Sequence, residues 1–280
     1  NKPGFKAISL NERLSTRIHV KARYNNSKNV IARITGSKRP GEYIIYTAHW
    51  DHFGIGQPDK NGDSIYNGAI DNASGTAALL EMARAFKNSS VKPERSILFI
   101  AVTAEEQGLL GSEYYCSHPL YPLNKTVAVL NMDVVNANGK TKDIVISGMG
   151  QNELEDYVSA IAKKQGRYIA PDDHPEAGHY FRSDHFSFAK KGVPALSVGG
   201  GIDDAEKGKA FGRKLENDYT MNHYHQPSDE YDSHWTFAGG LEDIDLLYQV
   251  GKQLASESNW PAWKAGSEFK TIREKSKNTP

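Results

Sequence analysis

Short apolar runs that alternate with helical stripes constrain the fold of this chain more than any other feature. Five runs rich in Val and Ile have the length and composition of buried strands, and they occupy residues 43–48, 96–104, 126–133, 143–148 and 194–198. Helical patterns lie between several of them. Strands that alternate with helices predict an α/β fold with a mixed, largely parallel central sheet, covered by helices on both faces.

The helices are predicted from apolar side chains that recur at helical spacing. Residues 74–86 carry one such stripe, residues 152–166 a second, and residues 241–254 a third. In the second stretch, Asn152 and Glu155 have the spacing of a capping box, and Gly166 is a helix-ending residue. The stripes consist of Leu79, Met82, Ala83 and Phe86; Leu154, Tyr157, Val158 and Ile161; and Leu241, Ile244, Leu247, Val250 and Leu254.

Length and composition exclude several classes of protein. The 280 residues fit one large α/β domain or two small ones. The 34 basic and 34 acidic residues give a net charge of zero, and no basic stripe suggests binding of nucleic acid. No apolar run approaches the roughly 20 residues of a membrane span. The single Cys116 excludes an internal disulfide and a cysteine-based zinc site, and we expect it to be a buried apolar side chain.

The ends of the chain are expected to be peripheral to one catalytic domain over residues 1–280. Residues 1–27 are less regular than the rest, and residues 269–280 are charged, so we expect the chain to fray from about Phe269. Because the chain starts at Asn1 rather than Met, we expect that an upstream segment has been removed, together with any targeting signal.

Polar clusters follow the predicted strands. His49, Asp51 and His52 come after the first strand, Glu105 and Glu106 after the second, and Asp133 after the third. Asp71 stands before the first helical stripe, and His223 and His225 lie in a later cluster, "NHYHQPSDEYD". Ligands of such sheets bind beyond the carboxyl ends of the strands, so we expect these side chains to converge on one edge.

Imidazole and carboxylate groups without thiolates suit zinc, and also cobalt, manganese or iron. The candidate ligands are His49, Asp71, Glu105 or Glu106, Asp133, and His223 or His225. Successive residues near a strand end point in different directions. One glutamate of the pair can therefore bind metal while its neighbour takes a proton from the metal-bound water. Asp51 and Asp229 are placed to orient His49 and His225, respectively, by hydrogen bonds to their second ring nitrogens.

The ordered set "AHWDH", "NGAIDNASG", "TAEEQGLLGS", "LNMD", "RSDHFSF" and "YHQPSDEYD" resembles the co-catalytic di-zinc aminopeptidases over residues 28–258. Their clan also contains glutamate carboxypeptidases, glutaminyl cyclases and the transferrin receptor. The resemblance implies a zinc exopeptidase fold of the phosphorylase/hydrolase-like type and two zinc ions per chain. The similarity is greatest to bacterial secreted or periplasmic aminopeptidases, so an exported protein is expected. Many of these carry a protease-associated domain, which this sequence does not contain.

The resemblance also implies a role for individual residues. His49 and Asp133 would bind one zinc, Glu106 and His225 the other, and Asp71 would bridge them. Glu105 would be the general base and Tyr224 would hydrogen-bond the oxyanion, while Arg182 would line the substrate pocket. The pattern Tyr-His-x-x-x-Asp favours His225 over His223. The family further suggests a cis peptide between Asp71 and Asn72. His52, His179, His185 and His234 match no zinc ligand and are expected to be loop residues or hydrogen-bonding partners of the ligands. The sequence does not distinguish whether Phe181, Phe186 and Phe188 line a substrate pocket or pack in the core.

These residues predict a zinc-dependent aminopeptidase that acts on peptides with a free N-terminus through a metal-bridged water. Three alternatives remain. A carboxypeptidase of the same clan would need basic residues for the terminal carboxylate, a glutaminyl cyclase works with one zinc, and an inactive receptor-like binding domain would have lost ligands. The sequence indicates neither the preferred N-terminal residue nor the oligomeric state.

Overall fold

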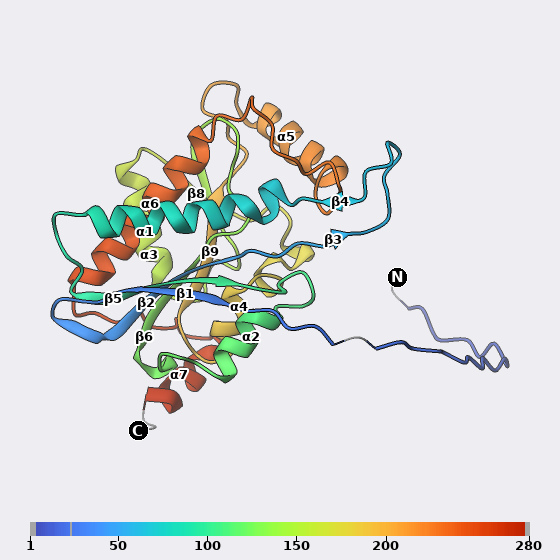
Figure 1. The fold of residues 1–280 in the computed structure, drawn as a ribbon, viewed down its shortest axis with the longest axis horizontal. Coiled ribbons are helices and arrows are strands. Elements are labelled where there is room, and N and C mark those ends of the chain that lie inside the picture. The colour runs from blue at the N-terminus through green and yellow to red at the C-terminus, as the bar shows by residue number, and fades with distance from the viewer. Residues whose placement is uncertain (1–3, 23, 278–280) are drawn as a thin grey trace.

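The central sheet is mixed and largely parallel, as predicted. The computed structural model describes residues 4–22 and 24–277, and seven strands within them form one sheet in the order β1-β5-β2-β6-β9-β7-β8 (Figure 1). Strands β5, β2, β6 and β9 are parallel neighbours, while β1 is antiparallel to β5 and β7 is antiparallel to β9. The strands are β1 (Val30–Ile34), β2 (Arg39–His49), β5 (Arg95–Val102), β6 (Thr126–Asn131), β7 (Asp143–Ile146), β8 (Tyr168–Ala170) and β9 (Ala195–Gly200).

Each predicted strand is present, and the sheet has two further strands at its edges. β1 and β8 were not predicted, because edge strands are short and half exposed and so lack a continuous apolar run. Val30 of β1 is 61% exposed, and β8 has only three residues. A separate pair, β3 (Gly54–Ile55) and β4 (Ile65–Tyr66), forms a small hairpin beside the main sheet.

Helices cover both faces of the sheet. On one face lie α1 (Gly75–Asn88), α3 (Leu154–Lys164) and α6 (Ala238–Ser256), and on the other lie α2 (Leu110–Ser117) and α4 (His185–Ala189). Two further helices are α5 (Lys209–Asn222) and α7 (Phe269–Lys277), and a π-helical turn, η1, spans Ala69–Ser74. Short 3-10 helices in the described residues span Leu123–Lys125, Pro175–Ala177 and His179–Phe181. None of the helices that the structure describes is long and apolar enough to cross a membrane.

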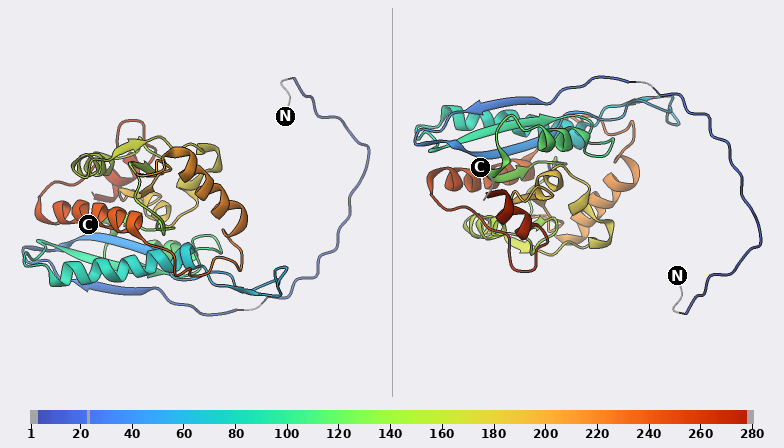
Figure 2. Two further views of the ribbon diagram at one scale, coloured as in Figure 1. Left: turned by 90° about the horizontal axis from the view of Figure 1, so that it is seen from above. Right: turned by 90° about the horizontal axis from the view of Figure 1, so that it is seen from below.

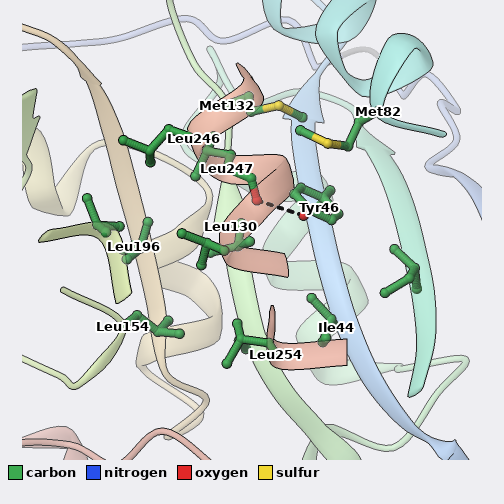
Figure 3. Close-up of a cluster of buried hydrophobic side chains, with 14 of the residues drawn as sticks. Ile44, Tyr46, Met82, Leu130, Met132, Leu154, Leu196, Leu246, Leu247 and Leu254 are labelled. Atoms are coloured by element: carbon green, nitrogen blue, oxygen red, sulfur yellow. Dashed lines mark hydrogen bonds between the residues drawn. The ribbon is translucent and has the colours of Figure 1, made fainter. Parts of the chain in front are cut away.

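The core lies in two layers because successive side chains of a strand point to opposite faces. Ile44 and Tyr46 of β2 pack under α1, α3 and α6, whereas Ile45 faces α2 and α4. Figure 3 shows the first layer, in which the Tyr46 hydroxyl donates a hydrogen bond of 2.9 Å to the carbonyl oxygen of Leu247 on α6. Cys116 is buried in the second layer, as expected. The sheet is thereby held rigidly on both sides.

The capping box predicted for the second helix is present only in part, just before α3, whose N-cap residue is Glu153. The backbone N–H of Asn152 donates to the Glu155 carboxylate at 3.0 Å, and the Asn152 side-chain oxygen accepts from the N–H of Leu154 at 3.0 Å. Gly166, just after α3, has a φ of +74°, the left-handed conformation that ends helices.

The two ends of the chain differ from each other. Residues 4–22 and 24–28 extend away from the body as an exposed arm (Figures 1 and 2). The expected fraying from Phe269 is wrong for residues 269–277, which form α7; residues 278–280 lie outside the described part. Phe269 and Arg273 are four residues apart and share the buried face of α7. Arg273 donates to the carbonyls of Leu123 and Thr126 at 3.1 and 2.6 Å, which fixes the helix to the sheet.

We expect helix α1 to distinguish core from surface in a matched pair of variants. Met82 is fully buried, so Met82→Ala should lower the free energy of unfolding by about 2–5 kcal/mol. Leu80 on the same helix is 68% exposed, so Leu80→Ala should change it by less than about 0.5 kcal/mol. Urea unfolding with a chelator present, so that metal binding does not contribute, measures both. Equal losses would contradict this packing.

Candidate active site

The carboxyl ends of three neighbouring parallel strands bring the polar clusters together. His49 is the last residue of β2, Glu105 and Glu106 follow β5, and Asp133 follows β6. Because β5, β2 and β6 are adjacent and run in the same direction, their ends meet at one edge of the sheet. Asp71 in turn η1 and His225, after α5, approach the same point from two further segments. The structure therefore brings all the proposed ligands together.

Asp71 lies at the centre of this group, with one oxygen toward each of two histidines. Its Oδ1 is 3.1 Å from Nε2 of His49, and its Oδ2 is 3.3 Å from Nε2 of His225. Nε2 of His49 is also 3.3 Å from Oδ1 of Asp133, and Nε2 of His225 is 3.2 Å from Oε2 of Glu106. The five side chains thus form two adjacent groups that share Asp71. The cis peptide suggested for Asp71–Asn72 is also present.

Asp229 holds the segment that carries Asp71, which differs from its predicted contact with His225. The Asp229 carboxylate accepts the backbone N–H groups of Ile70 and Asp71, each at 3.0 Å. Its carbonyl oxygen accepts the N–H of Ala69 at 3.0 Å. The chain turns at His225, where φ is +59°, and this turn directs Asp229 toward the η1 backbone. Asp229 therefore positions Asp71 from behind.

Asp51 has a similar role for the adjacent glutamates. Its two carboxylate oxygens accept the backbone N–H groups of Glu105 and Glu106, at 3.0 and 3.4 Å. The predicted support of His49 is also present in part, because Nδ1 of His49 lies 3.1 Å from the carbonyl oxygen of Asp51 and 3.8 Å from its carboxylate. The carbonyl oxygen, rather than the carboxylate, is therefore the closer partner of His49.

Glu105 and Glu106 differ in their surroundings although they are neighbours. Glu106 faces His225, and hydrogen bonds from His225 and His52 outweigh burial and lower the pKa of its carboxyl. Glu105 is buried beside Asp133, and burial together with the nearby negative charge raises the pKa of its carboxyl to about 9. The structure thus separates one carboxylate that accepts hydrogen bonds from two histidines from one that holds a proton readily.

The pKa values of the two histidines nearest Asp71, His49 and His225, are both raised. Burial disfavours a charged ring, but hydrogen bonds with Asp133 and Asp71 outweigh it and raise the pKa of His49 to about 12. For His225, burial is likewise outweighed by Asp71 and Glu106, which raise its pKa to about 9. The site therefore requires positive charge to balance its carboxylates.

The residues present fit zinc. The donors are imidazole nitrogens and carboxylate oxygens, the set that zinc prefers at catalytic sites. Zinc bonds of roughly 2.0–2.1 Å in tetrahedral geometry place two ligand atoms about 3.3 Å apart. The four distances that join His49 and His225 to their carboxylates are 3.1–3.3 Å. Both groups of ligands are therefore spaced as a zinc site requires.

A cavity of about 1060 Å³ opens onto this group. Tyr224 and Arg182 line it, as predicted: the Tyr224 ring stacks on His225 with centroids 3.8 Å apart, and its hydroxyl is 3.5 Å from Nη2 of Arg182. Of the three phenylalanines left open by the sequence, Phe181 and Phe186 line the cavity and Phe188 is fully buried in the core. These two rings give the cavity wall an apolar part beside its charged and polar side chains.

The remaining histidines lie in different places. His223 is outside the ligand group, with Nδ1 2.9 Å from the carbonyl oxygen of Ser228. His179 lines the cavity, His185 is fully buried, and His234 is exposed. His52 contacts Glu106 through Nδ1 at 2.7 Å, which agrees with the alternative that it is a partner of a ligand, although the sequence did not indicate which ligand. Its only signal in the sequence is its position three residues after His49.

Ser183 was missed. Its hydroxyl donates to Oδ2 of Asp133 at 2.7 Å, and it accepts a hydrogen bond of 2.7 Å from the Asn131 side chain. Nothing in the sequence distinguishes this serine from others in loops.

An α/β sheet with imidazole and carboxylate groups gathered beyond its parallel strands defines a metal-dependent hydrolase. Residues 29–248 match the model of peptidase family M28, and the chain belongs to that family. Over 132 residues it is 38% identical to a glutamate carboxypeptidase 2 homolog of Caenorhabditis elegans, a match covering 45% of this chain and 16% of that protein. Over 140 residues it is 34% identical to aminopeptidase NAALADL1 of Mus musculus, covering 47% and 17%. The matches therefore span about a sixth of these curated relatives.

Solved structures share the fold. BSAP, a zinc aminopeptidase from Bacillus subtilis, superimposes with a TM-score of 0.60 at 25% identity, covering 82% of this chain and 51% of that one. A glutaminyl cyclase from Bacteroides thetaiotaomicron gives a TM-score of 0.53 at 20% identity, covering 82% and 77%. The family and the aminopeptidase neighbour support a zinc-dependent hydrolase of peptides, while the cyclase shows the shared fold alone.

We expect zinc affinity to keep rising with pH through pH 9. Zinc binds the neutral imidazole, so the protons on His225 and His49, whose pKa values are raised from 6.5 to about 9 and about 12, compete with zinc over this whole range. An ordinary histidine site would level off above about pH 7. Competition with a chromophoric chelator, whose own pH dependence is measured alone, gives the affinity of the metal-free protein. A plateau between pH 7 and pH 9 would contradict these shifts.

Proposed function

We propose that this chain is a zinc-dependent aminopeptidase with two zinc ions. The observation that carries the proposal is the position of Asp71, whose two oxygens each face a different histidine at 3.1 and 3.3 Å. A carboxylate can bridge two metals about 3.5–4 Å apart. His49 and Asp133 would hold one zinc, and Glu106 and His225 the other. A glutaminyl cyclase with one zinc would not need the second group.

When bound, zinc supplies a Lewis acid that polarises the scissile carbonyl and acidifies the attacking water. Glu105 takes the proton of that water and delivers it to the leaving amine. Burial and Asp133 raise the pKa of Glu105 to about 9 in the metal-free site, and the positive charge of bound zinc would lower it again, so that the carboxylate is ionised and able to take the proton. The Tyr224 hydroxyl, which faces the cavity beside His225, donates a hydrogen bond to the oxygen that becomes negatively charged.

The charge of the cavity favours a substrate with a free amino terminus. The carboxylates of the proposed ligands line the cavity, together with the acidic Glu176 and with Glu216, which is paired with Arg213. An ammonium group is attracted by such a surface. We further propose that the protein acts after export, on peptides outside the cytoplasm, because its motifs most resemble those of exported bacterial enzymes.

A carboxypeptidase is the second candidate, and Arg182 is the observation that favours it. A terminal carboxylate needs a free cation in the cavity. Among the described residues, Arg182 and Lys190 are the Arg and Lys side chains that line the cavity, and Lys190 is already paired with Glu113. One available arginine beside several carboxylates is weaker support than the carboxylates that line the cavity. A receptor-like domain without activity is disfavoured because every proposed ligand is present.

A panel of substrates tests the choice. Aminoacyl chromophores with a free amine should be cleaved, and the cleavage should stop with a chelator and return with zinc. Peptides that have a blocked amine and a free carboxylate should not be cleaved. Cleavage of the blocked peptides alone would establish the carboxypeptidase, and cyclisation of N-terminal glutamine would establish the cyclase. Metal analysis of the purified protein should give two metals per chain.

We expect Glu105→Gln and Glu106→Gln to separate the roles of these neighbours. Glu105→Gln should keep both metals and lower kcat by about 10²–10⁴-fold, the usual contribution of a positioned proton-transfer group. Substrate affinity should change much less, since the loss is in the transition state. Glu106→Gln should weaken one metal site because an amide is a poorer ligand, and added zinc should restore part of its activity.

Metal content and kcat of both variants decide this assignment. Loss of metal in Glu105→Gln with retention in Glu106→Gln would reverse it. Full activity in both variants would remove these residues from the mechanism.

A further inference from the structure

His52 is buried beside the proposed ligand Glu106. It follows β2, its side chain is 5% exposed, and its Nδ1 lies 2.7 Å from Oε1 of Glu106. A carboxylate that serves as a metal ligand is ionised and only accepts hydrogen bonds, so at this distance Nδ1 of His52 is the donor. The ring is fixed by packing against Phe53, with centroids 4.8 Å apart. Gly68 leaves the necessary space, because a Cβ there would be 2.8 Å from two ring atoms.

The two oxygens of Glu106 therefore have different partners. Oε2 is 3.2 Å from Nε2 of His225, a spacing that two ligands of one zinc would also have, whereas Oε1 is 2.7 Å from His52, which is too short for two ligands of one zinc and fits only a hydrogen bond. The same division occurs at the other end of the site. Asp133 has Oδ1 3.3 Å from His49, while Oδ2 accepts a 2.7 Å hydrogen bond from Ser183. Each terminal carboxylate thus has one oxygen at ligand spacing from a histidine and one held by a closer hydrogen bond.

We propose that His52 is a positioning residue that occupies Oε1 of Glu106 and so fixes this glutamate as a ligand through one oxygen. The inference rests on the two-metal site of the proposed function, but it does not depend on which peptide bond is cleaved. Hydrogen-bonded partners of metal ligands typically change metal affinity by about 10–100-fold. His52 would therefore set the affinity of the Glu106–His225 site, and Ser183 would do the same for the His49–Asp133 site.

The test measures zinc binding without substrate in His52→Ala, His52→Asn and the matched variant Ser183→Ala. Chelator competition resolves the two sites. His52→Ala should weaken one site about 10–100-fold and leave the other unchanged, and Ser183→Ala should weaken the other one. His52→Asn should retain most of the affinity, because an asparagine amide can donate from nearly the position of Nδ1. In a Glu106→Gln background, His52→Ala should add little, since the group it positions has been changed.

Cobalt in place of zinc gives a second readout. His52→Ala frees Oε1 of Glu106 to bind the metal, so the visible absorption of bound cobalt should weaken as its coordination number rises, while His52→Asn should resemble the unaltered protein. Thermal unfolding with chelator present shows whether each variant is folded, and His52→Asn keeps the test valid should His52→Ala not fold.

The outcomes that overturn the inference are distinct. Unchanged affinity and spectrum in His52→Ala, with two metals bound to the unaltered protein, would overturn this inference alone. Equal loss in His52→Asn and His52→Ala would mean that the imidazole is itself a ligand. A single metal in the unaltered protein would overturn the two-metal proposal and this inference together.

Discussion

The concentration of carboxylates at one sheet edge is the constraint on which the rest of the structure depends. Asp71, Glu105, Glu106 and Asp133 all line the same cavity. Two like charges 4 Å apart repel by about 4 kcal/mol at the effective dielectric constant near a protein surface. A group of this kind is stable only with positive charge between its members. His49 and His225 lie at those positions, and in the working protein zinc would replace their protons.

The scaffold holds these groups by the backbone as well as by their side chains. Asp51 accepts the N–H groups of Glu105 and Glu106, and Asp229 accepts those of Ile70 and Asp71. Neither aspartate is among the proposed ligands, yet each fixes a segment that carries one. A carboxylate that accepts two backbone N–H groups is a strong and geometrically specific restraint. Ligand geometry is therefore set before metal arrives, which reduces the free energy that binding must supply.

Substrate choice depends on different parts of the fold. The sheet edge supplies the inner end of the cavity, while the loop around His174 and one face of α5 supply its outer wall. None of the described residues of α5 is buried, so few core contacts constrain its sequence. A family can keep one metal-binding edge and change these walls. This division agrees with the range of activities named among the relatives, from aminopeptidase to glutamate carboxypeptidase.

The sequence by itself determined the strands, the main helices and the set of residues that meet at the sheet edge. These depend on local patterns: apolar runs, helical stripes and the rule that parallel strands end together. The family resemblance added the pairing of ligands, and the structure places them accordingly. Edge strands β1 and β8 and helix α7 were missed because their apolar signal is short and half exposed.

Only the tertiary structure decided which groups hold the ligands in place. Asp229 lies four residues from His225 in sequence, yet its carboxylate contacts the backbone of Ile70 and Asp71, more than a hundred residues earlier. His52 and Ser183 are ordinary loop residues in the sequence, and each becomes the partner of a carboxylate through a chain turn that no local pattern encodes. A hydrogen bond depends on distance and direction to within a few tenths of an ångström. Those quantities exist only once the segments have packed against each other.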